Sequence, residues 1–245
     1  MKRTVVYIGA AAILFFVWWI LSSFLALPIV PNPWSVVSCL QSIFLSSIAI
    51  HAIYSLGRIA LGLVLAVGIG YPIGIFMGYA ARADRIFSPF VYLMYPVPKI
   101  ALLPILMLLA GVGEMSKVLM LFLIIVFQVI IAVRDAVRAI PQETYMSLLS
   151  LGASLFSIFR HVLWPASLPK FITAVRVAMA TAISVLFFTE TFGSQYGLGY
   201  FIMDAWLRVN YLEMYAGIVV LSLLGLLLFS MLDFIEMRVC RWQYK

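Results

Sequence analysis

Four long stretches with almost no charge constrain this chain more than any other feature. They are TVVYIGAAAILFFVWWILSSFLAL, IALGLVLAVGIGYPIGIFMGYAA, VLMLFLIIVFQVIIAV and MYAGIVVLSLLGLLLFSML. Each is close to the roughly 20 apolar residues that a membrane-spanning helix needs. With 65% hydrophobic and 10% charged residues over 245 positions, the chain has more apolar surface than a soluble domain could bury. The sequence therefore predicts an all-α integral membrane protein with one domain, residues 1–245.

Two further spans are expected, each with one charged residue. The stretch from about Ile86 to Ala110 contains Lys99, and the stretch from about Phe171 to Phe188 contains Arg176. A charge at this depth is costly unless it faces protein or water, so both helices should have an interior face. The six expected spans cover residues 5–27, 59–81, 86–110, 116–134, 171–190 and 214–232.

The distribution of basic residues predicts the orientation of these spans. An even number of spans puts both termini on the same side of the membrane. One side then carries Lys2, Arg3, Arg82, Arg85, Arg134, Arg138, Arg160, Lys170, Arg238, Arg241 and Lys245. The other side carries Arg58, Lys117 and Arg208. Because cytoplasmic loops are enriched in Lys and Arg, both termini and the loop at residues 140–168 are expected in the cytoplasm. The net charge of +7 then needs no nucleic-acid partner.

Prolines and glycines punctuate the spans. Pro28, Pro31 and Pro33 should end the first helix, and the segment after them is expected to lie at the outer interface and lead into the second span. That span carries small residues at four-residue steps: Gly62, Ala66, Gly70, Gly74 and Gly78. Such a stripe lets another helix approach closely, and packing within one subunit is favoured over a dimer interface. Pro96, Pro98 and Pro104 break the third span, as is common in transport proteins.

The sequence contains none of the motifs expected of an enzyme. No Gly-x-x-x-x-Gly-Lys-Ser/Thr occurs, so the chain is not expected to hydrolyse nucleotide alone. His51 and His161 are predicted on opposite faces of the membrane, and no cluster has metal-ligand spacing. The same argument separates Cys39 from Cys240, which therefore cannot pair within one subunit. The spans also lack the series of carboxylates expected of an ion-driven carrier. If the chain is a transporter, its energy is therefore expected to come from another subunit.

The polar interruption at residues 140–168 is too patterned to be a simple tether. Leu155, Ile158, Phe159 and Val162 recur at helical spacing, with Arg160 and His161 on the other side. Two short helices are expected here. Gly152 permits a tight turn between them, and Pro165 is expected to end the second before the next span.

Five motifs, in order, resemble one branch of the binding-protein-dependent ABC importer permeases, the nitrate/sulfonate/taurine/bicarbonate branch. They are SLGR from Ser55, PKIALLP from Pro98, GVGEMSK from Gly111, SLGAS from Ser150 with VLWP from Val162, and GLGYFI from Gly197. The family loop is written Glu-Ala-Ala-x3-Gly-x9-Ile-x-Leu-Pro, and Gly152 and Pro165 match it. The resemblance implies a six-span type I importer permease fold in a bacterial or archaeal cytoplasmic membrane.

The resemblance also implies roles and partners. The loop would be a coupling helix contacting a cytoplasmic ATPase through Leu151, Gly152, Ala153 and Ser154, with Pro165 in support. The expected assembly has a second permease, identical or related, two ATPases and an external substrate-binding protein. ATP and Mg would be bound by the ATPases, and this chain would need no cofactor of its own.

The sequence departs from the family at the acidic triplet of the loop. Met146, Ser147 and Leu148 stand where Glu-Ala-Ala belongs, and the nearest acid, Glu143, lies one helical turn earlier. Because residues three apart share a helical face, Glu143 is a candidate for the missing charge. A second departure, Leu109 and Ala110 in place of Trp-Phe, affects the outer end of the third span.

Five residues are candidates for the pathway or its gate. Lys99 could attract anions, or could instead extend to an interface or pair with a neighbour. Arg58, at the outer end of the second span, could alternatively be a topological anchor. Glu190 precedes a glycine-rich turn containing Gly197 and Gly199, which is either a gate or receptor contact, or simply the end of a helix.

Two other functions are compatible with the spans alone. One is a secondary transporter or channel without an ATPase, and the other is a structural membrane subunit that moves nothing. The expected solute is a small anion such as a sulfonate, nitrate or bicarbonate, or a vitamin or pyrimidine precursor. The external binding protein usually sets this choice, so the permease sequence alone leaves it open.

Overall fold

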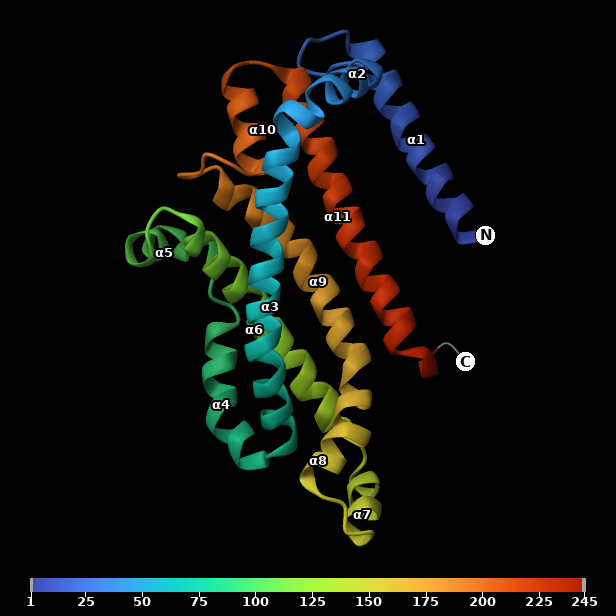
Figure 1. Ribbon diagram of the computed structural model, residues 1–245, viewed down its shortest axis with the longest axis vertical. Helices are drawn as coiled ribbons and strands as arrows, with labels where there is room; N and C mark the ends of the chain where they lie inside the picture. Colours follow the sequence, from blue (N-terminus) through green and yellow to red (C-terminus); the bar gives the residue numbers. More distant parts are fainter. Residues whose placement is uncertain (1, 244–245) are drawn as a thin grey trace. The chain divides into compact units, whose positions relative to one another are not determined.

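The structure is a computed structural model that describes residues 2–243, and it is helical almost throughout (Figure 1). Lys245 and the side chains of Lys2 and Arg3, which the charge count includes, lie outside the described part. The long helices are α1 (Lys2–Leu25), α3 (Ala49–Tyr79), α6 (Glu114–Arg138), α9 (Trp164–Glu190) and α11 (Tyr211–Val239). The shorter ones are α2 (Pro33–Ile43), α4 (Ala81–Met94), α5 (Leu103–Ala110), α7 (Gln142–Ser150), α8 (Leu155–Ile158) and α10 (Leu198–Leu207). Two π-helical turns, η1 (Phe44–Ile48) and η3 (Phe159–Leu163), and two 3-10 turns, η2 (Lys99–Leu102) and η4 (Arg241–Gln243), complete the secondary structure of this part.

The chain divides into two compact units. Unit 1 comprises residues 1–55 and 190–224, and unit 2 comprises residues 56–189 and 225–245. Helices α3, α9 and α11 each pass from one unit into the other.

Within the described part, four helical stretches are long and apolar enough to cross a membrane: Pro33–Tyr79, Glu114–Arg138, Leu155–Glu190 and Tyr211–Val239. A bent pair, Ala81–Met94 with Lys99–Ala110, makes a fifth if it is one span. The first expected span corresponds to α1, where the described apolar portion is the shorter Gly9–Leu25. The membrane helices are thus confirmed as a class, while the count of six stays a prediction.

The structure defines two of the expected spans more closely. The interface segment leads into the second span without a break, because helix continues from Pro33 to Tyr79 through the π-helical turn η1. The expected break in the third span is present, because α4 ends at Met94 and the next helical stretch, Lys99–Ala110, lies at 81° to it. Pro96 and Pro98 explain this break, since proline lacks a backbone N–H and disfavours helix in the residue before it.

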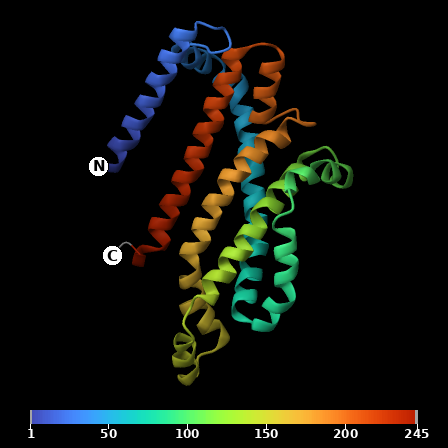
Figure 2. The same cartoon turned by 180° about the vertical axis from the view of Figure 1, so that it is seen from behind.

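The core of unit 2 is the contact between α6 and the glycine stripe of α3, which lie side by side in Figures 1 and 2. A β-carbon on Gly62, Gly74 or Gly78 would lie 2.7, 2.7 or 2.5 Å from a β-carbon of α6. Ala66, in the same stripe, is fully buried. The backbones approach this closely only because these positions lack side chains. Packing within one subunit is therefore confirmed as a use of the stripe.

Candidate functional site

Helix α7 is the least buried helix of the coupling segment, residues 140–168. It follows Pro141, and none of its residues is buried. The half-buried Tyr145 provides its contact with the helices above, since its ring lies 5.8 Å from that of Tyr79 and its hydroxyl donates to the Val137 carbonyl at 3.4 Å. Burial raises the pKa of the Tyr145 phenol above its usual range. Figure 1 shows α7 and α8 beyond the ends of α6 and α9, and α7 presents most of its surface to its surroundings.

A Schellman motif ends α7 and fixes the elbow of the segment. The Gly152 N–H donates to the Leu149 carbonyl at 3.0 Å, and the Ala153 N–H donates to the Leu148 carbonyl at 3.0 Å. These two crossed bonds require a left-handed residue after the helix, and Gly152 has a φ of +73°. The expected tight turn at Gly152 is present, and its hydrogen bonds give the elbow a defined geometry.

Ser154 starts the helix on the other side of the elbow. Its side chain accepts a hydrogen bond from the Ser157 N–H at 3.2 Å, which is the usual N-cap geometry. Ile158 and Val162 are buried, and Arg160 is exposed, as their helical spacing predicted. Leu155 is instead 71% exposed, since it lies in the first turn of α8, next to the elbow. The second arm of the elbow is therefore anchored by burial, unlike α7.

The expectation that Pro165 ends this second helix is wrong. Helix runs without interruption from Leu155 to Glu190, through the π-helical turn η3. In that turn the Trp164 N–H donates to the Phe159 carbonyl, five residues back. The hydrogen-bond register has therefore already shifted where Pro165 lacks its N–H, and the proline is accommodated at the start of α9.

Large apolar side chains crowd the elbow without burial. We call the following five residues the exposed apolar tip: Met146, Leu149, Leu151, Leu155 and Phe156. Leu151 is the most exposed of them, at 83%. Glu143 is also exposed, in the first turn of α7, and within the described residues no ion pair engages it. The tip offers apolar area next to a carboxylate.

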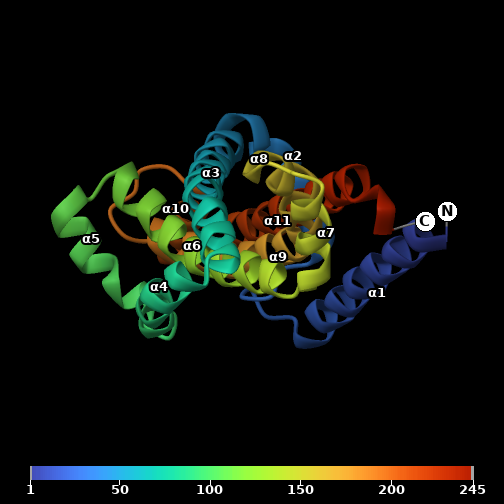
Figure 3. The ribbon, with the colours of Figure 1, turned by 90° about the horizontal axis from the view of Figure 1, so that it is seen from below.

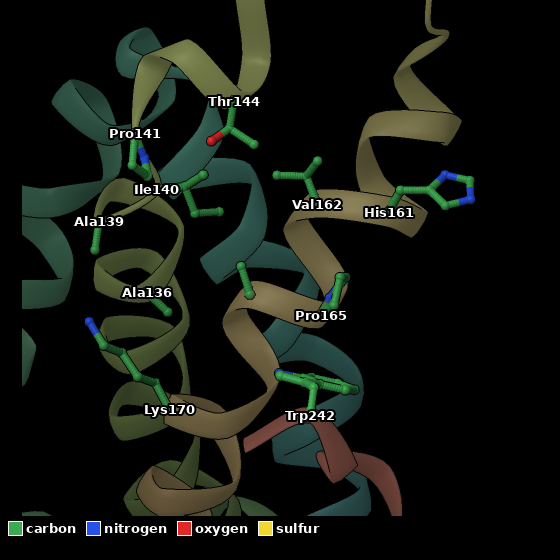
Figure 4. A pocket seen from close by; sticks show the side chains of 11 residues that line it. Ala136, Ala139, Ile140, Pro141, Thr144, His161, Val162, Pro165, Lys170 and Trp242 are labelled. Carbon is green, nitrogen blue, oxygen red and sulfur yellow. The ribbon is translucent and has the colours of Figure 1, made fainter. Parts of the chain in front are cut away.

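A cavity of about 540 Å³ lies where the coupling segment leaves α6 and joins α9 (Figure 4). Figure 4 shows Ile140, Thr144 and Val162 facing one another across it, with His161 pointing away. Trp242, from the C-terminal turn, lies below Pro165 on its far side. The cavity separates the start of α7 from the start of α9, and the contacts of Tyr145 with Tyr79 and Val137 join α7 to the helices above it.

In unit 1, side chains cap the start of α10. Three successive N–H groups donate to them: Gly197 to His51 Nδ1 at 3.1 Å, Leu198 to Ser55 Oγ at 2.8 Å, and Gly199 to Glu190 Oε2 at 2.8 Å. The first N–H groups of a helix have no partner within it, so this cap satisfies donors that burial would otherwise leave unpaired. Three of the five pathway candidates thus lie at one place.

Glu190 is the centre of this cap. Its carboxylate is fully buried and also accepts a hydrogen bond from the Ser55 hydroxyl, at 2.8 Å from Oε1 and 3.0 Å from Oε2. Negative charge at a helix N-terminus is stabilised by the helix dipole. Sequence reasoning did not assign His51 and Ser55 to this site, although their four-residue spacing on one helical face was the available signal.

Arg58 in unit 2 joins two of the sequence motifs. Its Nε and Nη2 contact the two carboxylate oxygens of Glu114 at 2.6 Å each. The guanidinium is buried, whereas the Glu114 side chain is 56% exposed. Lys117 is buried beside them and donates to the Gly113 carbonyl at 3.1 Å. SLGR and GVGEMSK therefore form one structural clasp, which agrees with an anchoring role for Arg58.

Lys99 lies at the break between α4 and α5. Its ammonium donates to the Tyr95 carbonyl at 2.5 Å and lies 5.3 Å from the ring centroids of both Tyr95 and Phe127. These contacts are those of a lysine that pairs with its neighbours. Its role in a pathway stays a prediction.

Ion pairs hold three further arginines of unit 2. Arg176 contacts Asp233 and Glu236 of α11 at 2.5 Å each, so the expected interior face of this span is present. Asp84 of α4 accepts from Arg134 and Arg138 at the end of α6. Each of these pairs joins two helices.

The comparisons with known proteins agree with the arrangement of these elements. Residues 70–241 match the family model described as "Binding-protein-dependent transport system inner membrane component". The taurine transport system permease protein of Escherichia coli K12 is 30% identical, with 98% of this chain and 90% of the relative covered. The formylaminopyrimidine transport permease protein of Halalkalibacterium halodurans is 27% identical, with 89% and 87% covered.

A solved structure has the same fold. It is an inward-facing form of the MetNI methionine ABC transporter, with a TM-score of 0.68 at 22% identity. The match covers 77% of this chain and 94% of that chain.

Proposed function

Because the chain belongs to the family of binding-protein-dependent transport system inner membrane components, we propose that residues 140–168 couple this permease to a cytoplasmic ATPase and that its solute is a small sulfonate. The family membership makes the chain a multi-pass permease subunit of an ABC importer. A secondary carrier and a non-transporting subunit therefore lose their support. The observation that carries the coupling proposal is the exposed apolar tip on a hydrogen-bonded elbow.

The tip has the properties of a docking element. Five large apolar side chains exposed within eleven residues are unfavourable in water, and the polar sequence around them is unsuited to the bilayer interior. An amphipathic helix of this kind typically docks into an apolar groove of a partner. In the proposed complex that groove belongs to the ATPase, and Glu143 beside the tip adds a polar contact.

The path from the tip to the membrane is continuous. The elbow is fixed by its Schellman motif, and helix then runs from Leu155 to Glu190 without a break. Ile158, Val162 and Leu163 bury the start of that path in unit 2. Movement of the tip therefore reaches α9 directly, and in the proposed cycle this movement produces alternating access.

The proposed assembly contains a second permease, identical or related, two ATPases and an external binding protein. ATP and Mg bind to the ATPases, which perform the hydrolysis. The five pathway candidates have three different roles in this proposal. Glu190, with Gly197 and Gly199, forms the cap that holds α10 at the outer side. Arg58 is an anchor, and Lys99 lies at a helix break that the solute path can use.

A sulfonate is proposed because the taurine permease is 30% identical over nearly the whole chain, and taurine is an amino sulfonate. A formylaminopyrimidine is the second candidate, since that permease is 27% identical over 89% of the chain. The test is uptake of labelled taurine into cells that lack their own sulfonate importers and express this chain with its neighbouring ATPase and binding protein. Uptake of the pyrimidine alone would exclude the sulfonate.

The coupling proposal has its own test, which needs no solute. Gly152→Pro removes the N–H bond to Leu149 and imposes a φ near −65° where the chain has +73°. We expect it to reduce co-purification of the ATPase and to lower transport per ATP. Gly152→Ala should have the same effect in weaker form, because a left-handed alanine costs about 1–2 kcal/mol.

Gly111→Ala is the control for strain at a glycine outside the segment. A methyl group added at Gly111, as at Gly152, would meet no atom within 4 Å. The φ of +80° and ψ of 165° at Gly111 form a conformation that essentially only glycine adopts, so alanine is strained there at least as much as at Gly152. It lies at the opposite end of α6 from the coupling segment. Normal transport by Gly152→Pro, or equal loss of ATPase binding in Gly111→Ala and Gly152→Ala, would show that the segment does not couple.

A further inference from the structure

Two arginines at the start of α4 differ from the arginines that unit 2 uses in ion pairs. Arg82 and Arg85 are exposed, and no ion pair or hydrogen bond with another described residue engages either side chain. By contrast, Arg134, Arg138 and Arg176 each contact a carboxylate. The two arginines are three residues apart, so they lie on the same side of α4.

The nearest carboxylate is already occupied. Asp84 lies between the two arginines in sequence but is only 13% exposed and accepts from Arg134, Arg138 and the Ser88 hydroxyl. Two carboxylates, Asp84 and Asp135, thus stand against four arginines at this end of α4 and α6. A local surplus of positive charge remains, and it lies on Arg82 and Arg85.

An apolar stripe continues from the arginines along the same face of α4. Ile86, Phe90 and Leu93 follow Arg82 at helical spacing and are 61%, 66% and 68% exposed. Val91, on the opposite face, is buried. Figure 3 shows α4 at the periphery of unit 2, outside α6, so this stripe faces away from the unit. Two cationic side chains followed by an apolar stripe complement a phospholipid, which has an anionic headgroup followed by acyl chains.

The ion pairs of Asp84 show which end of α6 lies beside the start of α4. Because Asp84 binds arginines in the last two turns of α6, the start of α4 lies at the end where the coupling segment begins. The distribution of basic residues predicts that this end lies at the cytoplasmic leaflet, where anionic lipids attract arginine side chains.

We propose that Arg82 and Arg85 bind the phosphate headgroup of an anionic phospholipid whose acyl chains lie along Ile86, Phe90 and Leu93. We infer a lipid and not free phosphate because the apolar stripe continues directly from the arginines, and only a lipid has acyl chains that would contact it. The site is independent of the solute that the permease carries. It would favour phosphatidylglycerol over the zwitterionic phosphatidylcholine.

The test uses the purified permease with its ATPase in nanodiscs made from equal amounts of the two lipids. After mild delipidation, mass spectrometry measures the phosphatidylglycerol enriched over phosphatidylcholine on the complex. Each arginine beside an anionic headgroup strengthens binding about fivefold, so Arg82→Gln with Arg85→Gln should reduce the enrichment about 25-fold. Arg82→Lys with Arg85→Lys keeps the charge, should keep most of the enrichment, and shows that the position tolerates substitution.

The matched control is Arg238→Gln with Arg241→Gln. This pair has the same separation in sequence and the same charge loss at exposed positions, but α11 ends at Val239, so the two arginines do not share a helical face, and Arg238 stacks on Phe234. It should change the enrichment little. An equal loss of enrichment in both double variants would show that general surface charge, and not a site on α4, attracts the lipid. Unchanged enrichment in the α4 variant would also overturn the proposal.

Two other occupants give different results. If excess inorganic phosphate displaced the retained lipid, a free anion and not a lipid would be the ligand. If the α4 variant lost the second permease from the complex while lipid enrichment stayed unchanged, this face would be a contact between copies. Either result contradicts the proposal.

Discussion

The glycine stripe of α3 gives the sharpest prediction of stability. A β-carbon placed on Gly78 would lie 2.5 Å from Val137 Cβ, 2.8 Å from Val137 Cγ1 and 2.9 Å from the Arg134 carbonyl oxygen. Carbon atoms pack best at about 3.5–4.0 Å. Since a β-carbon cannot rotate away and one of its neighbours is backbone, Gly78→Ala must push α3 and α6 apart by roughly 1 Å.

The cost follows from what the two helices lose. Overpacking a tight contact costs typically about 1–3 kcal/mol. In a membrane the added methyl group gains little from burial, because lipid is as apolar as the helix contact, so nothing offsets this cost. We therefore expect Gly78→Ala to lower the free energy of unfolding by about 1–3 kcal/mol.

The second step is a double variant. Gly74 meets Val133 Cβ at 2.7 Å, one helical turn from Gly78. Once one alanine has separated the helices, the second finds more room, so Gly74→Ala with Gly78→Ala should cost less than the sum of the single variants.

The assay is thermal or denaturant unfolding of the purified permease in detergent, followed by tryptophan fluorescence. Gly68→Ala is the matched control, because Gly68 lies on the same helix and a β-carbon there meets no atom within 4 Å. It should be neutral or slightly stabilising, since alanine favours helix over glycine. Equal stability of Gly78→Ala and Gly68→Ala, or strict additivity of the Gly74 and Gly78 variants, would refute the close contact.

Four shorter predictions concern other sites. Glu143→Ala should weaken the stimulated ATP hydrolysis of the reconstituted complex, and Glu143→Gln should weaken it less; wild-type rates in Glu143→Ala would remove this carboxylate from the coupling proposal. Ser154→Ala should destabilise the start of α8 by about 1 kcal/mol, seen as faster amide hydrogen exchange there, while Ser154→Asp should restore the cap. Glu190→Ala should cost about 1–3 kcal/mol by leaving buried donors without an acceptor, and Glu190→Gln should cost less because it keeps one acceptor; unchanged melting of Glu190→Ala would contradict the cap. An impermeant maleimide should label Cys39 in intact cells, whereas Cys240, which is fully buried and whose pKa is raised by burial, should react only after unfolding; labelling of Cys39 only after the membrane is permeabilised would reverse the orientation.

Sequence reasoning succeeded where the signal was local. The small residues of α3 recur at a fixed step, so their packing role can be predicted from spacing alone. The same holds for Gly152, because a glycine between two helical patterns indicates a left-handed turn. Proline gave less. Pro96 and Pro98 predicted a break but not the 81° bend, which depends on what the two arms pack against.

The failures have two physical causes. Pro165 was expected to end a helix, but whether a helix tolerates proline depends on the hydrogen-bond register, which spacing does not reveal. The cap of α10 joins residues that lie 135 and 146 positions apart, such as Ser55 with Glu190 and His51 with Gly197. The four-residue spacing of His51 and Ser55 indicates that they share a helical face, but a single sequence does not say which distant carboxylate and N–H groups that face meets.

The π-helical turn η3 has a consequence for the direction in which the coupling segment points. A π-helical turn contains one more residue than an α-helical turn, and each residue of an α-helix turns the chain by about 100°. The turn from Phe159 to Leu163 holds five residues where regular helix would advance by about four, so a change of these same residues to regular α-helix would rotate the elbow around the α9 axis by roughly 100°. The hydrogen-bond register of this one turn thus sets the azimuth of the whole coupling segment, and a variant that kept every residue but lost the π-helical turn would aim an unchanged surface away from its partner.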